Sequence, residues 1–254
     1  MKINIDRLKT LNKTKIYRIS FKVKENTLEY KKNLGIPMLS IIEKNKKVEK
    51  VIPTKVEVDN SKLISLTFDD APSIYTEEIL NVLNKNKARA TFFVIGNRIH
   101  GNESLIKKIN SFGNEIGIHG YSHTAFTEME VEDVDAEIAA TYSMLNDLNV
   151  APTNIVRPPY GKLNETIKEE VASPFVLWNI DATGSDAINK ILSAKEGSII
   201  KLHDDIRTIK LLEEVLPKLN ENGYKVVTIS EMNKRYSNSL LPGRVYAKIK
   251  EYVA

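Results

Sequence analysis

The 254-residue sequence contains no cysteine, and this absence removes several kinds of chemistry. Without thiols the protein has no disulfides, no zinc–thiolate site and no cysteine nucleophile, although the compartment stays undetermined. Glycine and proline are also scarce, at 11 and 9 residues, and the sequence is 42% hydrophobic and 28% charged. These values exclude a collagen-like, low-complexity or wholly disordered chain. The length suits one α/β domain with an appendage, or two small domains.

Long apolar runs are missing as well. No run approaches the roughly 20 residues that cross a bilayer, so we expect no membrane span in the chain. The first residues, MKINIDR, lack the apolar core of a signal peptide. We therefore expect that an export signal was removed or never existed.

Acidic residues are under-represented at the start of the chain. Residues 1–60 contain 15 basic and 7 acidic residues, a net charge of +8, whereas the remainder carries −4. A basic N-terminal region is compatible with attraction to nucleic acid, membrane or a cell-wall polymer, and also with a solvated lysine-rich face. Because no DNA- or RNA-binding motif is present, we expect no nucleic-acid partner.

Two hydrophobic patterns follow one another along the chain. Residues 16–24 alternate apolar and polar side chains and residues 38–58 are strand-rich, which predicts a small β-rich N-terminal region over residues 1–60. From there short apolar strands alternate with amphipathic helices over residues 61–240, and residues 241–254 form a C-terminal tail. The predicted strands cover 63–68, 90–95, 115–118, 154–156, 174–178, 198–203 and 225–228, and the predicted helices 103–112, 131–148 and 208–222.

The alternation of strands and helices is typical of parallel strands covered by helices. Seven such units fit either a seven-stranded barrel or an open doubly wound sheet, and periodicity does not choose between them. Polar residues stand where the predicted strands end, and in both folds ligands bind at that edge. These residues are Asp69, Asp70, His119, His123, Arg157, Asp181 and His203.

Each of these residues also has an ordinary structural explanation. The two adjacent Asp could begin a turn or cap a helix, and the two His of the pair could be one exposed and one packed side chain. Arg157 could be a surface residue, Asp181 a loop cap and His203 a hydrogen-bonded core residue. Because all of these residues lie at one edge of the predicted sheet, the case for a joint functional site is stronger than the case for any one residue alone.

Five ordered strings resemble the motifs of the polysaccharide deacetylases, the NodB-homology domains of carbohydrate esterase family four. The resemblance covers about residues 62–235, including the ending GYKVVTISE at 223–231, whereas residues 1–60 match nothing. With this resemblance, we expect an α/β fold of the distorted seven-stranded (β/α) barrel type with a small β-rich N-terminal extension. The strings are TFDDAP at 67–72, HGYSH at 119–123, RPPYG at 157–161, WNID at 178–181 and LHD at 202–204.

The resemblance implies a set of roles. A divalent metal ion, zinc or else cobalt, nickel or manganese, would be held by Asp70, His119 and His123. Asp69 would be the general base, oriented by Arg157, and the Tyr160 backbone N–H would stabilise the oxyanion. His203 would be the general acid, with its pKa raised by Asp181. Tyr160, Lys201 and Leu202 would contact the substrate.

The sequence departs from the family pattern at two motifs. The fourth motif usually reads D-x-x-D-W, but here the second Asp is displaced to Asp186 and the Trp is absent. In the fifth motif Lys201 replaces an apolar residue that lines the acetyl pocket. Its side chain either enters the site or reaches out through the rim. We expect activity with altered specificity.

The resulting hypothesis is a metal-dependent hydrolase, a monomer, that removes N-acetyl groups from N-acetylglucosamine in a polysaccharide, peptidoglycan in particular. Such a substrate places the protein outside the cell or at its surface. The alternatives are an O-acetyl (xylan-type) or small-molecule amide hydrolase, and a catalytically impaired glycan-binding protein.

Overall fold

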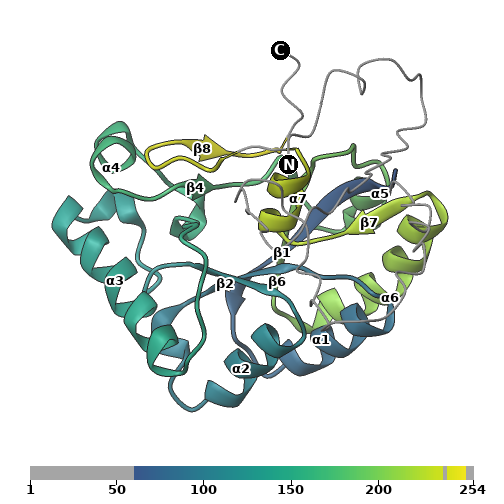
Figure 1. The fold of residues 1–254 in the computed structure, drawn as a ribbon, viewed down its shortest axis with the longest axis horizontal. Helices are drawn as coiled ribbons and strands as arrows, with labels where there is room; N and C mark the ends of the chain where they lie inside the picture. Colours follow the sequence, from purple (N-terminus) through teal and green to yellow (C-terminus); the bar gives the residue numbers. More distant parts are fainter. Residues whose placement is uncertain (1–59, 237–238, 250–254) are drawn as a thin grey trace, which may run out of the picture. The chain divides into compact units, whose positions relative to one another are not determined.

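The computed structural model describes residues 60–236 and 239–249, and the predicted β-rich region over residues 1–59 lies outside them. Strands and helices alternate along the described chain, with the strands at the centre (Figure 1). No helix within these two ranges combines the length and the apolar character that crossing a bilayer would require.

Parallel strands form the centre of the described domain. β1 pairs with β2 on one side and with β6 on the other, which gives the order β3-β2-β1-β6-β5, and β7 pairs with the start of β1. The strands are β1 (Lys62–Ala71), β2 (Thr91–Val94), β3 (Glu115–Ile118), β4 (Phe175–Val176), β5 (Ile180–Asp181), β6 (Ile199–His203), β7 (Tyr224–Val226) and β8 (Val245–Tyr246).

The strands close on themselves into a distorted barrel. The predicted strand at 154–156 is reduced to Val156, which forms parallel bridges to both β3 and β4. β4 and β5 lie in one continuous segment. At one end of it the Val176 amide donates to the Val156 carbonyl, and at the other the Ala182 amide donates to the Lys201 carbonyl of β6. Because this segment joins the two edges of the sheet, the expected barrel is confirmed and the open sheet is excluded.

Amphipathic helices cover the strands, and Figure 1 shows α1, α2, α3 and α6 as an arc along one side of them. The predicted helices correspond to α2, α3 and α6, whereas α1 falls outside the predicted ranges. Asp205 caps α6 by accepting hydrogen bonds from the amides of Arg207 and Thr208. The helices are α1 (Thr76–Lys85), α2 (Glu103–Ser111), α3 (Val131–Asp147), α4 (Glu165–Glu170), α5 (Ala187–Leu192), α6 (Ile206–Glu221) and α7 (Ile229–Arg235).

Strand alternation divides the apolar side chains between two cores. On β2, Phe92 and Val94 belong to the large cluster that includes the helices, whereas Phe93 between them belongs to a smaller cluster. The smaller cluster contains Ile229 and Met232 of α7. It therefore fills the interior of the barrel.

Helix α7 closes the barrel at the end where the strands begin. The Ile229 amide donates to Oγ1 of Thr91, and the Ser230 amide donates to Oε2 of Glu115. These two partners are the first residues of β2 and β3. The opposite end of the barrel, where the polar residues follow the strands, is not covered by α7 and carries the candidate site.

Part of the predicted C-terminal tail packs on the barrel. β8 pairs in parallel with β4, and the Ile249 side chain is only 2% exposed. The Ile249 amide also donates to the Gly197 carbonyl at 2.9 Å. Residues 244–249 therefore belong to the described fold.

Candidate active site and metal centre

Two consecutive carboxylates lie near the end of β1 in different surroundings. The pairing of β1 with β2 shifts its register between Phe68 and Ala71, and Asp70 has a φ of 65°. Such an irregularity turns a side chain away from the direction that regular alternation would give it. The Asp69 side chain is 4% exposed, whereas that of Asp70 is 29% exposed. One carboxylate is therefore buried and the other reaches the open end of the barrel.

Asp70, His119 and His123 form a cluster whose ligand atoms all lie within 4.8 Å of one another. Oδ1 of Asp70 is 3.2 Å from Nε2 of His123 and 3.6 Å from Nε2 of His119. His119 directly follows β3, and His123 comes from the loop after it. Two imidazole nitrogens and one carboxylate oxygen are a donor set that suits zinc and similar divalent ions. The residues therefore fit a divalent metal ion.

Buried contacts orient His119 for this role. Its Nδ1 is 2.7 Å from the backbone carbonyl oxygen of Arg157. A carbonyl oxygen only accepts, so Nδ1 carries the proton and Nε2 presents its lone pair to the cluster. Burial lowers the pKa of His119, and the nearby Asp69 carboxylate opposes this effect without cancelling it. The neutral imidazole, which is the metal-binding form, is therefore favoured.

Helix α3 holds the loop that carries His123, a function that the motifs do not reveal. Oε2 of Glu137 accepts hydrogen bonds from the amides of Tyr121 and Ser122, at 2.7 and 2.8 Å. One turn later Oγ1 of Thr141 donates to the Gly120 carbonyl at 2.9 Å. The helical spacing of the two α3 side chains is visible in the sequence, but the loop that they bind is not.

Arg157 is fully buried and forms an ion pair with Asp69. Its Nη1 is 2.6 Å from Oδ1 of Asp69, and its side chain also donates to Oγ1 of Thr67 and to two backbone carbonyls at 176–177, at 2.7 to 2.9 Å. Burial lowers the pKa of Arg157, and Asp69 counteracts this. Arginine nevertheless stays charged. The pair fixes one carboxylate oxygen, and within the described residues nothing else binds the carboxylate.

His203 ends β6 and lies beside Asp69 in the parallel register. Residues that are paired in this way on neighbouring strands place their side chains on the same face of a sheet. The Asp204 amide donates to the Asp69 carbonyl at 3.0 Å, which joins the two strand ends. The half-buried imidazole of His203 therefore lies on the same interior face as the Asp69 carboxylate.

Asp204 is a buried carboxylate that connects β6 to the loop before α1. Its oxygens accept hydrogen bonds from the hydroxyl and the amide of Ser73, at 2.9 and 3.1 Å, and from the Thr76 hydroxyl. Burial raises the pKa of Asp204, although these hydrogen bonds oppose the shift. These hydrogen bonds hold the segment that follows Asp70 against the end of β6.

Asp181 forms an ion pair with Lys201 and accepts hydrogen bonds from Thr183. Its Oδ2 lies 3.2 Å from Nζ of Lys201, and its Oδ1 accepts from the amide and the hydroxyl of Thr183, at 3.0 and 2.6 Å. Among the described residues no hydrogen bond or ion pair joins Asp181 to His203. Burial by itself raises the pKa of Asp181, but Thr183 and Lys201 outweigh it and hold the pKa below its usual value. Lys201 is the register neighbour of Asp181, which accounts for this pair. The role of Asp181 toward His203 stays a prediction.

The two remaining substrate-contact expectations on β6 have different outcomes. The Lys201 side chain is 14% exposed and lies inside the barrel, with Nζ 4.2 Å from the centroid of the Trp178 ring. It does not reach out through the rim. Leu202 is 1% exposed and belongs to the large cluster that faces the helices. Its position on the outer face of the strand does not support a contact with substrate.

Tyr160 lies in a short turn next to the metal-ligand cluster. Its backbone has φ 60° and ψ 6°, and its side chain is 62% exposed. The ring centroid is 4.7 Å from that of His123, and the Tyr160 amide donates to no carbonyl in the described part of the chain. At the following residue, Gly161, a Cβ atom would lie 2.7 Å from the Trp178 ring. Glycine therefore allows the turn to pack against the indole.

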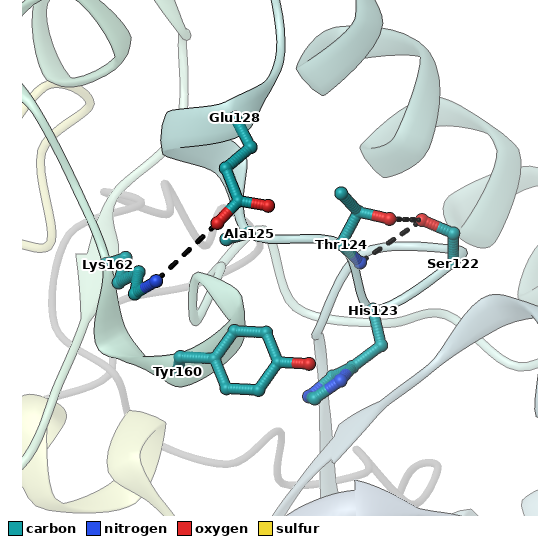
Figure 2. Close-up of a pocket in the computed structure, with 7 residues that line it drawn as sticks. All are labelled: Ser122, His123, Thr124, Ala125, Glu128, Tyr160 and Lys162. Atoms are coloured by element: carbon teal, nitrogen blue, oxygen red, sulfur yellow. Dashed lines mark hydrogen bonds and ion pairs between the residues drawn. The ribbon is translucent and has the colours of Figure 1, made fainter.

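An open pocket of about 560 Å³ borders this cluster. Figure 2 shows the Tyr160 hydroxyl pointing toward His123, with Glu128 and Lys162 together at the side of the pocket. Nζ of Lys162 lies 3.6 Å from Oε1 of Glu128. The pocket is lined by Ser122, His123, Thr124, Ala125, Glu128, Tyr160 and Lys162. An exposed aromatic ring among hydroxyl and charged groups suits a polar ligand with an apolar face.

Comparisons with known proteins agree with this geometry. The family model for polysaccharide deacetylase matches residues 57–174. A peptidoglycan-N-acetylglucosamine deacetylase of Bacillus cereus is 32% identical over 191 residues, which cover 68% of this chain and 89% of that protein. A bifunctional xylanase/deacetylase of Pseudobutyrivibrio xylanivorans is 34% identical over 184 residues, or 68% of this chain. The chain spans between 31% and 43% of the length of several curated relatives that it matches.

Solved structures give the same result. The family 4 acetyl xylan esterase from Clostridium thermocellum, in complex with a cobalt ion, superimposes with a TM-score of 0.69 and 28% identity. The match covers 74% of this chain and 99% of the esterase chain. The five motifs, the barrel and the Asp-His-His cluster thus agree with two relatives, the Bacillus cereus deacetylase and the Clostridium thermocellum esterase, that align over 89% and 99% of their own length. The chain belongs to the polysaccharide deacetylase family, carbohydrate esterase family four.

Proposed function

We propose that this domain is a metal-dependent N-deacetylase that releases acetate from N-acetylglucosamine residues of a polysaccharide, peptidoglycan in particular. The observation that carries the proposal is the convergence of three groups at one end of the barrel. The Asp70–His119–His123 cluster has its ligand atoms within 4.8 Å of one another. The Asp69–Arg157 pair and His203 lie next to it on neighbouring strand ends.

Asp70, His119 and His123 would hold the ion. When bound, a divalent ion supplies Lewis acidity, which makes water more acidic and a carbonyl group more electrophilic. Zinc is the favoured metal on the donor set, and cobalt, nickel and manganese are the alternatives.

Asp69 accepts the proton of the attacking water. Arg157 holds Oδ1 of this carboxylate at 2.6 Å, so Oδ2 is the oxygen that takes the proton. Attack at the acetamide carbonyl carbon places negative charge on the carbonyl oxygen, and the Tyr160 N–H donates to it. Each positioned acid or base of this kind contributes about 10²–10⁴ in rate.

His203 completes the reaction as the general acid. The C–N bond breaks as the imidazolium donates its proton to the nitrogen, which leaves as the sugar amine, and the acyl group leaves as acetate. Because His203 and Asp69 share one face of neighbouring strands, the acceptor can take a proton from the attacking water while the donor protonates the leaving nitrogen at the same carbonyl carbon.

The substrate class is supported by the pocket and by the relatives. The pocket beside His123 is open and offers hydroxyls, an aromatic ring and a charged pair, which suits one unit of a longer sugar chain. The Bacillus cereus relative is a peptidoglycan-N-acetylglucosamine deacetylase. A cell-wall substrate implies a location at the cell surface or outside the cell.

Acetate release tests the proposal. The wild-type chain should release acetate from N-acetylglucosamine oligomers and from peptidoglycan, lose the activity on complete chelation and regain it with zinc, cobalt, nickel or manganese. His119→Ala should not respond to added metal. Activity that survives complete metal removal would refute the mechanism, and an absence of acetate from both substrates would refute the reaction.

O-deacetylation of xylan is the second candidate. It is favoured by the similarity to the acetyl xylan esterase and to the xylanase/deacetylase. Acetylxylan is therefore a third substrate in the same assay, and a higher kcat/KM on acetylxylan than on the N-acetylated sugars would select this alternative.

A further inference from the structure

Lys201 is a lysine inside the barrel that the proposed reaction does not use. Alternation along β6 places it on the same interior face as His203, two residues away. Its side chain is only 14% exposed. Because a buried ammonium group is unfavourable unless it is paired, its contacts indicate its role.

The Lys201 ammonium has two partners in the described part of the chain. Nζ lies 3.2 Å from Oδ2 of Asp181 and 4.2 Å from the centroid of the Trp178 ring. The Arg157 guanidinium lies over the same indole, 5.4 Å from its centroid, and pairs with Asp69. Two cation–carboxylate pairs therefore share one aromatic ring beneath the site.

The two carboxylates differ in their access to the site. The Asp181 side chain is 40% exposed, whereas the Asp69 side chain is 4% exposed. Thr183 binds Oδ1 of Asp181 and Lys201 binds Oδ2, so the carboxylate cannot turn without losing one of them. Lys201 thus determines the orientation of an ionised acceptor that is open to solvent, one strand away from His203.

We propose that Lys201 is a positioning residue. Held over Trp178, its ammonium orients the Asp181 carboxylate to accept hydrogen bonds from hydroxyl or amide groups of the sugar that binds beside His203. The inference rests on the proposed function, since it concerns the same bound sugar. Lys201 acts on substrate affinity through Asp181 and takes no part in the proton transfers.

Steady-state kinetics on N-acetylglucosamine oligomers test this role. Lys201→Met should raise KM about tenfold, which corresponds to about 1.4 kcal/mol, and change kcat less than about threefold. Lys201→Arg should restore KM, because a guanidinium pairs with carboxylates and stacks on aromatic rings. Lys190→Met is the matched control: its Nζ lies 3.0 Å from the backbone carbonyl of Asp181 and makes no bond with the carboxylate. Its KM should stay at the wild-type value.

A double-mutant cycle tests whether Lys201 acts through Asp181. Asp181→Asn should raise KM, and adding Lys201→Met to it should raise KM no further, because the two residues form one interacting pair. Effects of the two substitutions that multiply would overturn the inference.

Fluorescence supplies a readout that needs no turnover. Trp178 is the only tryptophan in the sequence, so its emission reports on this cluster alone. Lys201→Met should change that emission and weaken the binding of oligomers titrated against it, and Lys201→Arg should reverse both effects. A merely structural lysine would lower the melting temperature and leave KM and oligomer affinity unchanged. Should Lys201→Met fail to fold, Lys201→Gln removes the charge, keeps a polar end and should give the same rise in KM.

The two proposals fail in different ways. A wild-type chain that releases acetate from no substrate overturns the proposed function, and the oligomer titration then still decides the role of Lys201. A wild-type chain that is active, with unchanged KM and oligomer affinity in Lys201→Met, overturns only the role of Lys201.

Discussion

Asp69→Asn tests the role of the proton acceptor without changing the metal ligands beside it. The substitution keeps the shape of the side chain and one oxygen for Arg157, but removes the charge and the ability to accept a proton from water. We expect kcat to fall by about 10²–10⁴, the range for loss of a positioned general base. Asp70, His119 and His123 are untouched and Asp69 makes no hydrogen bond with them among the described residues, so zinc binding measured by calorimetry should persist, with a loss below the roughly 10–100-fold that follows removal of a hydrogen-bonded neighbour of a ligand.

The same substitution has a cost in stability. Asp69 and Arg157 form a pair in which the Arg157 side chain is 0% exposed and the Asp69 side chain 4%. Removing one partner of such a pair leaves a buried charge without compensation and costs about 3–5 kcal/mol. The asparagine oxygen retains part of the interaction, so urea unfolding should show a loss toward the lower end of this range.

Asp186→Asn is the control for this experiment, since it makes the same chemical change at an exposed residue outside the cluster. It should leave both kcat and the free energy of unfolding near their wild-type values. A modest general base contributes at least about 10² in rate. If folded Asp69→Asn keeps more than about a tenth of the wild-type kcat, the loss is too small for a general base and the assigned role is wrong.

Three further predictions follow from the same geometry. His203→Gln should lower kcat by about 10²–10⁴ on oligomers while zinc affinity stays unchanged, and a matching loss of zinc affinity would place His203 among the ligands instead. Burial raises the pKa of Asp204 above its ordinary 3.8, so its folded form binds more protons than its unfolded form. Its contribution to stability is therefore full below pH 3.8 and is lost as the pH rises through the folded pKa. The wild-type advantage over Asp204→Asn in urea unfolding should accordingly grow as the pH falls from 7, and a shrinking advantage would contradict the buried-carboxylate interpretation. Gly161→Ala places a Cβ 2.7 Å from the Trp178 ring at a φ of +69°, which should cost about 1–3 kcal/mol and shift the tryptophan emission. Gly184→Ala, where no atom lies within 4 Å of the added Cβ, should do neither.

The barrel shows how far periodicity reaches. Strand and helix order could be predicted because each element carries its own apolar pattern, as α6 does with Leu212, Val215 and Leu219 on its buried face. Ring closure could not, because it depends on one segment, residues 175–182, whose two ends bond to different strands. Helix α1 was accessible in principle, since Ile79, Leu80 and Leu83 show helical spacing and are all buried.

The site divides in the same way. The sequence by itself determined which side chains follow the strands and hence that they would lie at one edge, because parallel strands end there. The resemblance to the polysaccharide deacetylases singled out Asp70, His119 and His123 among them as metal ligands. Only the tertiary structure decided that Asp181 pairs with Lys201, which requires the register of β5 on β6. Strand order and register depend on contacts between residues far apart in the chain, and no local pattern contains them.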